Sequence, residues 1–338
     1  MAESGVSQID DLLGGRTFAP LGSANCDPQA AGLIQDLLIG HGFTNLPGVL
    51  GRAHGTFGPQ TTDAAREFQS RHQLPPTGTI DLATLRSLID VHAPRPIACR
   101  GYLALVLDVA FTGMVRVMGL TTQFEGAGLF TAFNGNTDKA GLSFGLIQWA
   151  QKPGRLHELL AAFQAAQPAV FVEILGGGDA ATAAQLLAHT AKPRGGTDNG
   201  GATTDPSFDL IRDPWKSRFM EAGRSRPLQR VQVDTALAAF SKSLERLHRF
   251  APQIRSERGV AFMLDVANQH GDGGAESIFS KVQARGASEA ELLGAVQQES
   301  VARVRAQFGD GPETRATQDR REAFRTTALL SDEPLVVS

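Results

Sequence analysis

The chain has 338 residues, of which 42% are hydrophobic and 20% charged, and its formal net charge is -3 at pH 7. This length predicts two domains, each large enough to bury a core, and the composition is typical of a globular protein rather than a disordered or fibrous one. No apolar run reaches about 18 residues, so we expect no membrane insertion. We expect no nucleic-acid partner either, because the chain has neither a basic net charge nor a local basic patch.

The first part of the chain has the pattern of three short helices joined by Gly- and Pro-containing turns. Each helix has a signal for its first turn: Asp27-Pro28, Gly58-Pro59 and Asp81. Apolar residues then follow at helical spacing, which predicts a small bundle. The chain therefore divides into four predicted parts: a tail at 1–21, the bundle at 22–91, a Pro-containing linker at 92–99 and a larger domain at 100–338.

The turns and helices of this bundle carry a specific set of residues: Gln35, Gly55-Thr56-Phe57-Gly58-Pro59-Gln60-Thr61, Phe68-Gln69, Gly78-Thr79-Ile80-Asp81, Thr84 and Leu85. In order and spacing they resemble the peptidoglycan-binding module of bacterial and phage wall enzymes, over about residues 22 to 90. The resemblance implies peptidoglycan as the partner. Because such modules occur beside amidases, peptidases and glycosidases, it leaves the cleaved bond open.

Residues 100–338 have a mainly helical pattern with one interruption. An apolar-periodic run predicts one long helix over 102–124, which ends because Gly126 and Gly128 follow. Over 129–149, short apolar pairs separated by turn residues predict a β-hairpin or a three-stranded sheet. Helical patterns resume in six later segments: 155–163, 181–190, 231–250, 257–269, 289–308 and 315–325. We therefore expect a mainly α fold with a short antiparallel sheet.

Glu125 directly follows the predicted helix over 102–124. The negative end of the helix dipole and the nonpolar neighbours both disfavour its anion and raise the pKa of this carboxyl, which suits a general acid. Asp138 lies in a polar turn and should stay ionised. A glycosidase needs one acid to protonate the leaving oxygen and a second carboxylate to activate water or support the transition state. Each residue alone has an ordinary alternative, as a surface acid at a helix end or as a turn residue.

Glu125, the GNxD sequence at 135–138 and the LSFGxxQW sequence at 142–149 together resemble the lysozyme-like superfamily, in particular goose-type lysozymes and lytic transglycosylases. By that resemblance Glu125 is the general acid, Asp138 matches the hairpin carboxylate, and residues 145–148 close the cleft. The pattern is also similar to bacterial proteins that pair a wall-binding module with such a domain, and more distantly to chitosanases. It departs from the goose type after Gln148, where no further acid follows.

Five further residues are candidates for contacts with sugars: Ser143, Gln148, Trp149, Asn268 and His270. Trp149 could stack on a sugar face, although aromatic residues are usually core residues. Asn268 and His270 stand just before Gly271 at the end of an apolar helical pattern. They could form hydrogen bonds with sugars, or they could simply end the helix.

Asp265 falls on a helix face that is otherwise apolar. An unpaired charge would be costly there, because a buried carboxylate needs a partner. We therefore expect Asp265 to form a buried ion pair with Arg320 or Arg321, in a structural role.

The two cysteines, Cys26 and Cys99, are too few for a disulfide-rich scaffold, and no CxxC motif indicates a zinc site. They flank the bundle, so one bridge could form in an oxidising compartment, whereas two buried free thiols are the simpler interpretation. His157-Glu158 begins like a zinc-protease motif, but Ala161 stands where the second histidine would be. We expect neither a metal nor a cofactor, and the state of the cysteines stays open.

As a whole, the sequence predicts an enzyme that cleaves the β-1,4 glycan strand of peptidoglycan, either a muramidase or a lytic transglycosylase. The residue types do not separate these two, because both need the same acid. The alternatives are a chitosanase-like glycoside hydrolase and a non-catalytic cell-wall-binding protein.

The N-terminal segment carries Glu3, Asp10 and Asp11 and lacks the basic start and apolar stretch of a secretory signal. We expect synthesis in the cytoplasm and action in the periplasm or cell wall after non-classical export or injection, as a phage endolysin or an antibacterial secreted effector. An injected effector implies an immunity protein, and a component of the secretion machine, as partners. The oligomeric state is left open.

Overall fold

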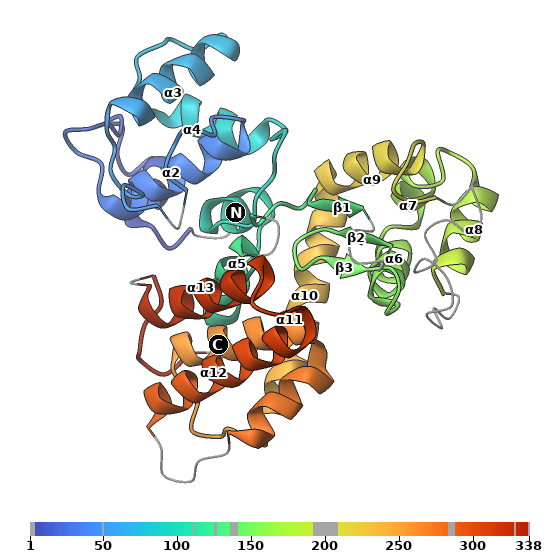
Figure 1. The fold of residues 1–338 in the computed structure, drawn as a ribbon. Helices are drawn as coiled ribbons and strands as arrows, with labels where there is room; N and C mark the ends of the chain where they lie inside the picture. The colour runs from blue at the N-terminus through green and yellow to red at the C-terminus, as the bar shows by residue number, and fades with distance from the viewer. Residues whose placement is uncertain are drawn as a thin grey trace. The chain divides into compact units, whose positions relative to one another are not determined.

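The computed structural model describes residues 4–48, 51–110, 112–124, 127–135, 141–191, 209–282, 288–327 and 329–336. The fold is mainly helical with a small antiparallel sheet, which confirms the predicted class (Figure 1). Contacts divide the chain into two compact units, formed by residues 1–111 with 125–235 and by residues 112–124 with 236–338. Each unit is described by itself. Among the described helices, none is long and apolar enough to cross a membrane.

The first module lies in unit 1 and contains the three predicted helices, α2 (Pro28–Gly40), α3 (Pro59–Arg71) and α4 (Leu82–Asp90). Two of the predicted start signals act as caps. The Asp27 carboxylate accepts a hydrogen bond from Ala30 N at 2.8 Å, and the Asp81 carboxylate accepts one from Thr84 N at 2.7 Å. Each bond satisfies a backbone donor that the first turn of a helix leaves free.

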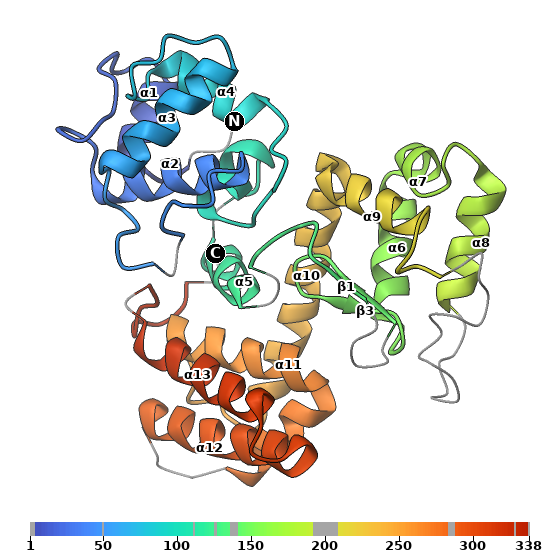
Figure 2. The same cartoon turned by 45° about the horizontal axis from the view of Figure 1, so that its top comes forward.

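A further helix, α1 (Ser7–Leu13), lies in the segment for which the sequence predicts only a tail. Ile9 and Leu12 are fully buried, and α1 packs against α2 and α4 (Figure 2). The helix is short and its apolar face consists of few residues, so the packing, rather than intrinsic helix propensity, stabilises it.

A buried glutamine fixes the turn between α2 and α3. Gln35 Nε2 donates to Thr56 O at 2.9 Å and to Thr61 Oγ1 at 3.0 Å, and Gln35 Oε1 accepts from Gly55 N at 2.9 Å. The side chain is fully buried, so one amide replaces the water that these polar groups would otherwise need.

Gln69 repeats this arrangement between α3 and α4. Its Nε2 donates to Thr79 O at 2.7 Å and to Thr84 Oγ1 at 3.0 Å, and its Oε1 accepts from Gly78 N at 2.9 Å. Both turns have the pattern G-T-x-x-x-x-T, at 55–61 and at 78–84. The module therefore contains one helix–turn unit twice, with α3 shared between the two copies.

The segment at 92–99, for which the sequence predicts a linker, is packed within unit 1. Ala98 N donates to Gly128 O at 2.8 Å, and Pro96 O accepts from Phe130 N at 3.1 Å. Five of the segment's eight residues are buried. The domain limits on either side of it stay a prediction.

The single long helix predicted over 102–124 is wrong, because the structure has two separate elements there. A π-helical turn, η1 (Tyr102–Val106), belongs to unit 1, and α5 (Gly113–Gln123) belongs to unit 2. Between them Asp108 has a φ of 54°, which no right-handed helix contains. Thr112 then caps α5 by accepting from Val115 N at 3.4 Å. Apolar residues on both sides of the break continue the helical period, so periodicity alone does not reveal it.

The predicted sheet is present, with strands β1 (Phe133–Gly135), β2 (Leu142–Phe144) and β3 (Trp149–Ala150) in the order β1-β2-β3. Asn134 pairs with Ser143, and Phe144 pairs with Trp149. The helices that follow in unit 1 are α6 (Arg155–Ala166), α7 (Pro168–Ile174), α8 (Ala180–Ala191) and α9 (Trp215–Arg224). The sequence predicts α6 and α8 but not α7 and α9. α6 packs on β2 and β3, which covers the apolar side of the sheet.

Helix α10 (Arg226–Leu247) begins in unit 1 and ends in unit 2. Unit 2 also contains α5, α11 (Glu257–Lys281), α12 (Glu289–Phe308) and α13 (Pro312–Thr326), and α11 contacts the other three (Figure 1). α12 has the predicted bounds and begins with a capping box between Ser288 and Glu291. α11 is kinked at Gly271, where φ is 68°. The glycine therefore interrupts the helix where the sequence predicts its end, but a second helical stretch follows.

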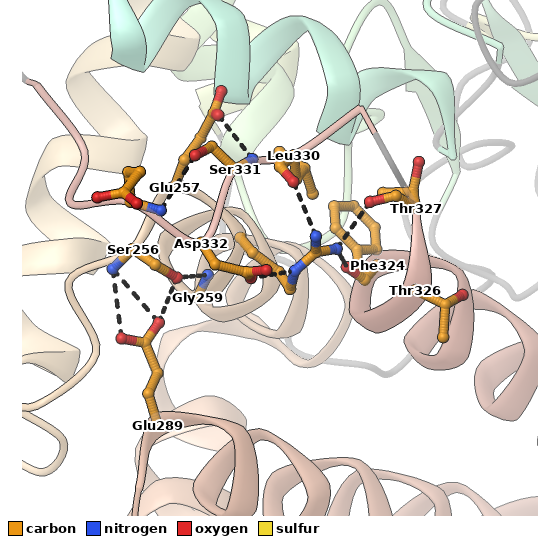
Figure 3. Close-up of polar contacts among 12 residues, drawn as sticks. Ser256, Glu257, Gly259, Glu289, Phe324, Thr326, Thr327, Leu330, Ser331 and Asp332 are labelled. Atoms are coloured by element: carbon orange, nitrogen blue, oxygen red, sulfur yellow. Dashed lines mark hydrogen bonds and ion pairs between the residues drawn. The ribbon is translucent and has the colours of Figure 1, made fainter.

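The C-terminal segment lies across the start of α11, where backbone hydrogen bonds and the Glu257 carboxylate bind it (Figure 3). The Arg258 side chain adds further contacts. Arg258 Nη1 donates to Phe324 O at 3.0 Å and to Thr327 O at 2.8 Å, and Nη2 donates to Leu330 O at 2.8 Å. Its Nε donates to the exposed Asp332 carboxylate at 2.6 Å. The guanidinium thus binds one carbonyl in the last turn of α13 and two carbonyls that follow this helix.

Glu289, the first residue of α12, binds the backbone at the same end of α11 (Figure 3). Its carboxylate accepts from Ser256 Oγ at 2.5 Å and from Arg255 N at 3.1 Å. Gly259 lies against this carboxylate so closely that a Cβ atom at position 259 would overlap Glu289 Oε1. A glycine is required there as long as Glu289 keeps this position.

Candidate functional site

The two predicted catalytic carboxylates, Glu125 and Asp138, lie outside the described residues. In the chain, Glu125 follows Phe124, which is the C-terminal cap residue of α5. Asp138 belongs to the connection between β1 and β2. The roles of both residues stay predictions.

A groove of about 780 Å³ opens in unit 2 beside α11, α12 and α13. Pockets of about 300–1,000 Å³ are typical of small-molecule sites. Its lining combines two aromatic rings with amide, imidazole, carboxylate and guanidinium groups, from Phe124, Phe308, Gln269, His270, Asp319 and Arg320. The groove thus offers apolar faces and hydrogen-bonding groups side by side, which is what an uncharged polar ligand such as a sugar needs.

The two aromatic rings of the groove differ in how they are held. The Phe124 ring lies 4.6 Å from the ring of buried Phe324, centroid to centroid, so packing fixes it. Phe308 is 54% exposed and ends α12. An exposed ring of this size next to polar groups provides apolar surface that a ligand could cover.

Below the groove, a buried ion network joins α11 to α13. Asp265 is fully buried; Arg320 Nε donates to its Oδ1 at 2.7 Å, and fully buried Arg321 pairs with its Oδ2. This confirms the ion pair predicted for Asp265, with both arginines taking part instead of one. The Phe262 ring also lies 5.7 Å from Arg321 Cζ, which adds a cation–π contact. Because a buried charge without its partner is strongly unfavourable, the network fixes α13 on α11 and holds Arg320 at the groove.

The same network orients Gln269 and His270. Arg321 Nη2 donates to Gln269 Oε1, and Gln269 Nε2 donates to Thr317 Oγ1 at 2.8 Å. Arg321 Nε donates to Ser300 Oγ at 3.3 Å, and Ser300 Oγ lies 2.7 Å from His270 Nε2. The predicted candidate His270 and its neighbour Gln269, which the sequence did not mark as a candidate, are therefore held by groups on α12 and α13.

Burial, together with the positive charges of Arg303 and Arg320, lowers the pKa of His270 to about 4. The imidazole is therefore neutral at pH 7. Asn268, the other candidate on this helix, has a buried Oδ1 with no hydrogen-bond partner among the described residues, and it does not line the groove. The structure thus places His270, but not Asn268, at a position that a ligand can reach.

The three candidates on the sheet of unit 1 also differ. Trp149 is 1% exposed and its ring packs beside Gly145, so it is a core residue whose faces are covered. This corrects the prediction that Trp149 stacks on a sugar. Gln148 donates to Gly145 O at 3.0 Å and accepts from Asn134 Nδ2 at 3.1 Å. Ser143 pairs with Asn134 across the strands, on the face opposite Phe144.

Asn134 is thus a polar residue of this face that sequence reasoning missed as a candidate. The signal was present, because it precedes Gly135 in the turn sequence between the strands. Together Asn134, Ser143 and Gln148 form a polar strip on the partly exposed side of the sheet.

Among the described residues, no three side chains of metal-ligating type come together. His157, which begins the incomplete zinc-protease sequence, bonds to Thr190 Oγ1 at 3.2 Å through Nδ1. Both cysteines are free thiols. Burial, followed by the charge of Asp27, raises the pKa of Cys26 to about 12, and burial is also the main cause that raises the pKa of Cys99, so neither thiol is activated as a nucleophile.

Comparison with known families identifies the first module. Residues 28–88 match the family described as the putative peptidoglycan binding domain. The match covers α2, α3 and α4, including the glutamines that fix the two turns, and confirms the resemblance seen in the sequence. It supports association with the cell wall and peptidoglycan as a partner. No curated protein matches the chain.

Proposed function

We propose that the chain is a peptidoglycan-directed glycosidase that cleaves the β-1,4 glycan strand. The observation that carries this proposal is the peptidoglycan-binding domain at 28–88, because a tethered binding domain raises the concentration of the rest of the chain at the wall polymer. The larger part of the chain adds a groove whose wall includes Phe124, and Glu125 is the next residue in the sequence.

In this proposal Glu125 is the general acid that protonates the glycosidic oxygen. It follows the end of α5, where the helix dipole disfavours a carboxylate anion. Asp138 positions the attacking water if the product is a reducing sugar, as in a muramidase. If the 6-hydroxyl of the muramic acid residue attacks instead, the enzyme is a lytic transglycosylase.

The test compares purified sacculi treated with the wild type and with Glu125→Gln. We expect the amide variant to fold normally and to lose lysis by about 10²–10⁴-fold, because it cannot donate the proton. Glu173→Gln, an exposed position on α7, is the matched control and should lyse like the wild type. Full activity of Glu125→Gln would refute the assignment. Mass spectrometry of the released fragments separates the hydrolase from the transglycosylase.

A non-catalytic wall-binding protein is the second candidate, because the binding domain at 28–88 supports it equally. Sedimentation with sacculi without any release of soluble fragments, by the wild type as well as by Glu125→Gln, would establish it. Digestion of soluble chitosan in place of sacculi would point to a chitosanase-like hydrolase.

As a wall-degrading enzyme, the protein would act in the periplasm or cell wall, either as a phage endolysin or as an injected effector. Co-purification from the producing cell with a small protein that blocks lysis would identify an immunity partner and favour the effector.

A further inference from the structure

We infer that the groove of unit 2 is a subsite for an N-acetylated sugar, in which His270 Nδ1 donates a hydrogen bond to the acetamido carbonyl oxygen. This inference rests on the proposed function, because it takes the wall glycan as the ligand. It assigns a chemical group of that glycan to one atom of the protein.

The hydrogen-bond chain behind His270 decides which of its nitrogens carries the proton. Arginine can only donate, so Ser300 Oγ accepts from Arg321 Nε. Ser300 is fully buried, so its own O–H needs an acceptor, and among the described residues His270 Nε2 at 2.7 Å is the one within hydrogen-bond distance. Nε2 is therefore the acceptor.

A neutral imidazole with an accepting Nε2 has its proton on Nδ1. The lowered pKa of His270, about 4, agrees with a neutral ring at pH 7. Nδ1 makes no hydrogen bond to any residue that the structure describes, and His270 lines the groove. The groove thus contains a fixed neutral donor.

Gln269, the residue next to His270, cannot donate this hydrogen bond to the ligand in its place. Gln269 Oε1 accepts from Arg321, and Gln269 Nε2 donates to Thr317 Oγ1. Arg321 is in turn held by Asp265, and both are fully buried. This leaves His270 as the group whose orientation is set by the buried network and whose free atom is still available to a ligand.

The chemistry around this donor fits an acetamido group better than a free amine or an anion. A neutral N–H donor needs an acceptor, which a carbonyl oxygen supplies and a protonated amine does not. Phe124 and Phe308 offer apolar surface for the acetyl methyl group or a sugar face. Glu313 and Asp319 also line the groove, where their carboxylates repel an anion and can accept from sugar hydroxyls.

The experiment uses the full chain carrying Glu125→Gln, so that the ligand is not turned over. Tetra-N-acetylchitotetraose is titrated by calorimetry, and long-range 1H–15N spectra of the histidines are recorded with and without it. We expect the free protein to show His270 protonated on Nδ1 and not on Nε2, and the Nδ1 signal to shift on addition of the ligand. The fully deacetylated tetrasaccharide should leave this signal unchanged.

Two variants connect the signal to affinity. His270→Ala should weaken binding about three- to tenfold, as expected for the loss of one neutral hydrogen bond. Ser300→Ala keeps the imidazole but removes the hydroxyl that donates to Nε2. Nε2 then no longer has to be the acceptor, so we expect a mixture of the two tautomers and a smaller loss of affinity than in His270→Ala. His92→Ala, an exposed histidine in the linker segment at 92–99, is the control and should bind like the parent.

Protonation on Nε2, an Nδ1 signal that does not move, or equal binding of the deacetylated sugar would overturn the inference. These outcomes are separate from the fate of the proposed function. If Glu125→Gln abolishes lysis but the acetylated sugar leaves the His270 signal unchanged, the proposed glycosidase activity is supported and the proposed subsite is refuted. If the sugar binds at His270 but Glu125→Gln still lyses sacculi, the proposed subsite is supported and the catalytic role of Glu125 is refuted.

Discussion

Replacing Gln69 with Leu should destabilise the peptidoglycan-binding domain by about 3 kcal/mol. Gln69 is 1% exposed, and its amide bonds to Gly78 N, Thr79 O and the hydroxyls of Thr77 and Thr84. Leucine has a similar volume but no polar atoms. The substitution therefore leaves the fold's shape nearly intact and removes the bonds that fix the turn between α3 and α4.

The magnitude follows from what is left unpaired. Gly78 and Thr84 are buried, and a buried polar group without a partner costs about 1–3 kcal/mol. Taking about 2 kcal/mol for each of these two groups, and subtracting about 1 kcal/mol for the more apolar side chain, gives a loss of about 3 kcal/mol. Thr79 is a less buried residue than Gly78, so water can partly replace the bond to its carbonyl, which adds little.

The assay is amide hydrogen exchange of the full chain, followed in peptides from α3 and α4. A loss of about 3 kcal/mol should accelerate exchange by about 100-fold where it occurs through opening of the domain. Gln60→Leu is the matched control, because Gln60 is exposed in the first turn of the same helix. If Gln69→Leu and Gln60→Leu exchanged at the same rate, the buried amide would not fix the turn and the reasoning would be refuted.

Three further predictions concern unit 2. Arg258→Ala should lower its stability by about 2–3 kcal/mol, whereas Asp332→Ala should cost less than about 1 kcal/mol because that carboxylate is 80% exposed; equal losses in urea unfolding would show that the ion pair, not the carbonyl contacts, matters. Asp265→Asn should destabilise by about 3–5 kcal/mol in calorimetric melts, since it leaves buried guanidinium charge uncompensated, and a near-neutral effect would contradict this. Below about pH 6.5 the unfolded chain protonates His270 but the folded chain does not until about pH 4, so stability should fall as the pH drops through this window; His270→Gln should remove that part of the pH dependence, and an unchanged slope would contradict the burial of the imidazole.

Helices whose ends are marked by local chemistry could be predicted from the sequence. Asp27 and Asp81 cap the helices whose starts they predict. α12 has the predicted bounds, and Ser288 and Glu291 form a capping box at its start. In each case the signal lies within a few residues of the helix start, so it does not depend on the rest of the fold.

Elements stabilised by distant contacts could not be predicted in this way. α1 depends on α2 and α4, and the break at Asp108 interrupts a run whose apolar period continues through it. On both sides of the break the buried positions are apolar and spaced as in a helix. This spacing is the same for one long helix and for two short ones, so it does not reveal the break.

The candidate site shows the same division. The ion pair of Asp265 could be predicted because a charge on an apolar face needs a partner wherever that partner comes from. The contact between His270 and Ser300 could not, because it joins two helices and neither residue type requires the other. The prediction of a sugar contact for Trp149 failed for a related reason. A tryptophan in the sequence is equally compatible with a buried core position and with a sugar-binding surface, and the structure buries this one.

The overlap between Gly259 and Glu289 constrains how related sequences can differ. A side chain at position 259 and a carboxylate in the place of Glu289 exclude each other, because both would occupy the same space at the start of α11. Two positions 30 residues apart (289 - 259) should therefore change together in an alignment. Any residue other than glycine at 259 needs a shorter residue at 289, and also a shift of Ile254, whose Cγ2 would lie 2.6 Å from the new Cβ. Substitution of one without the other would leave either a steric overlap or an unsatisfied helix start.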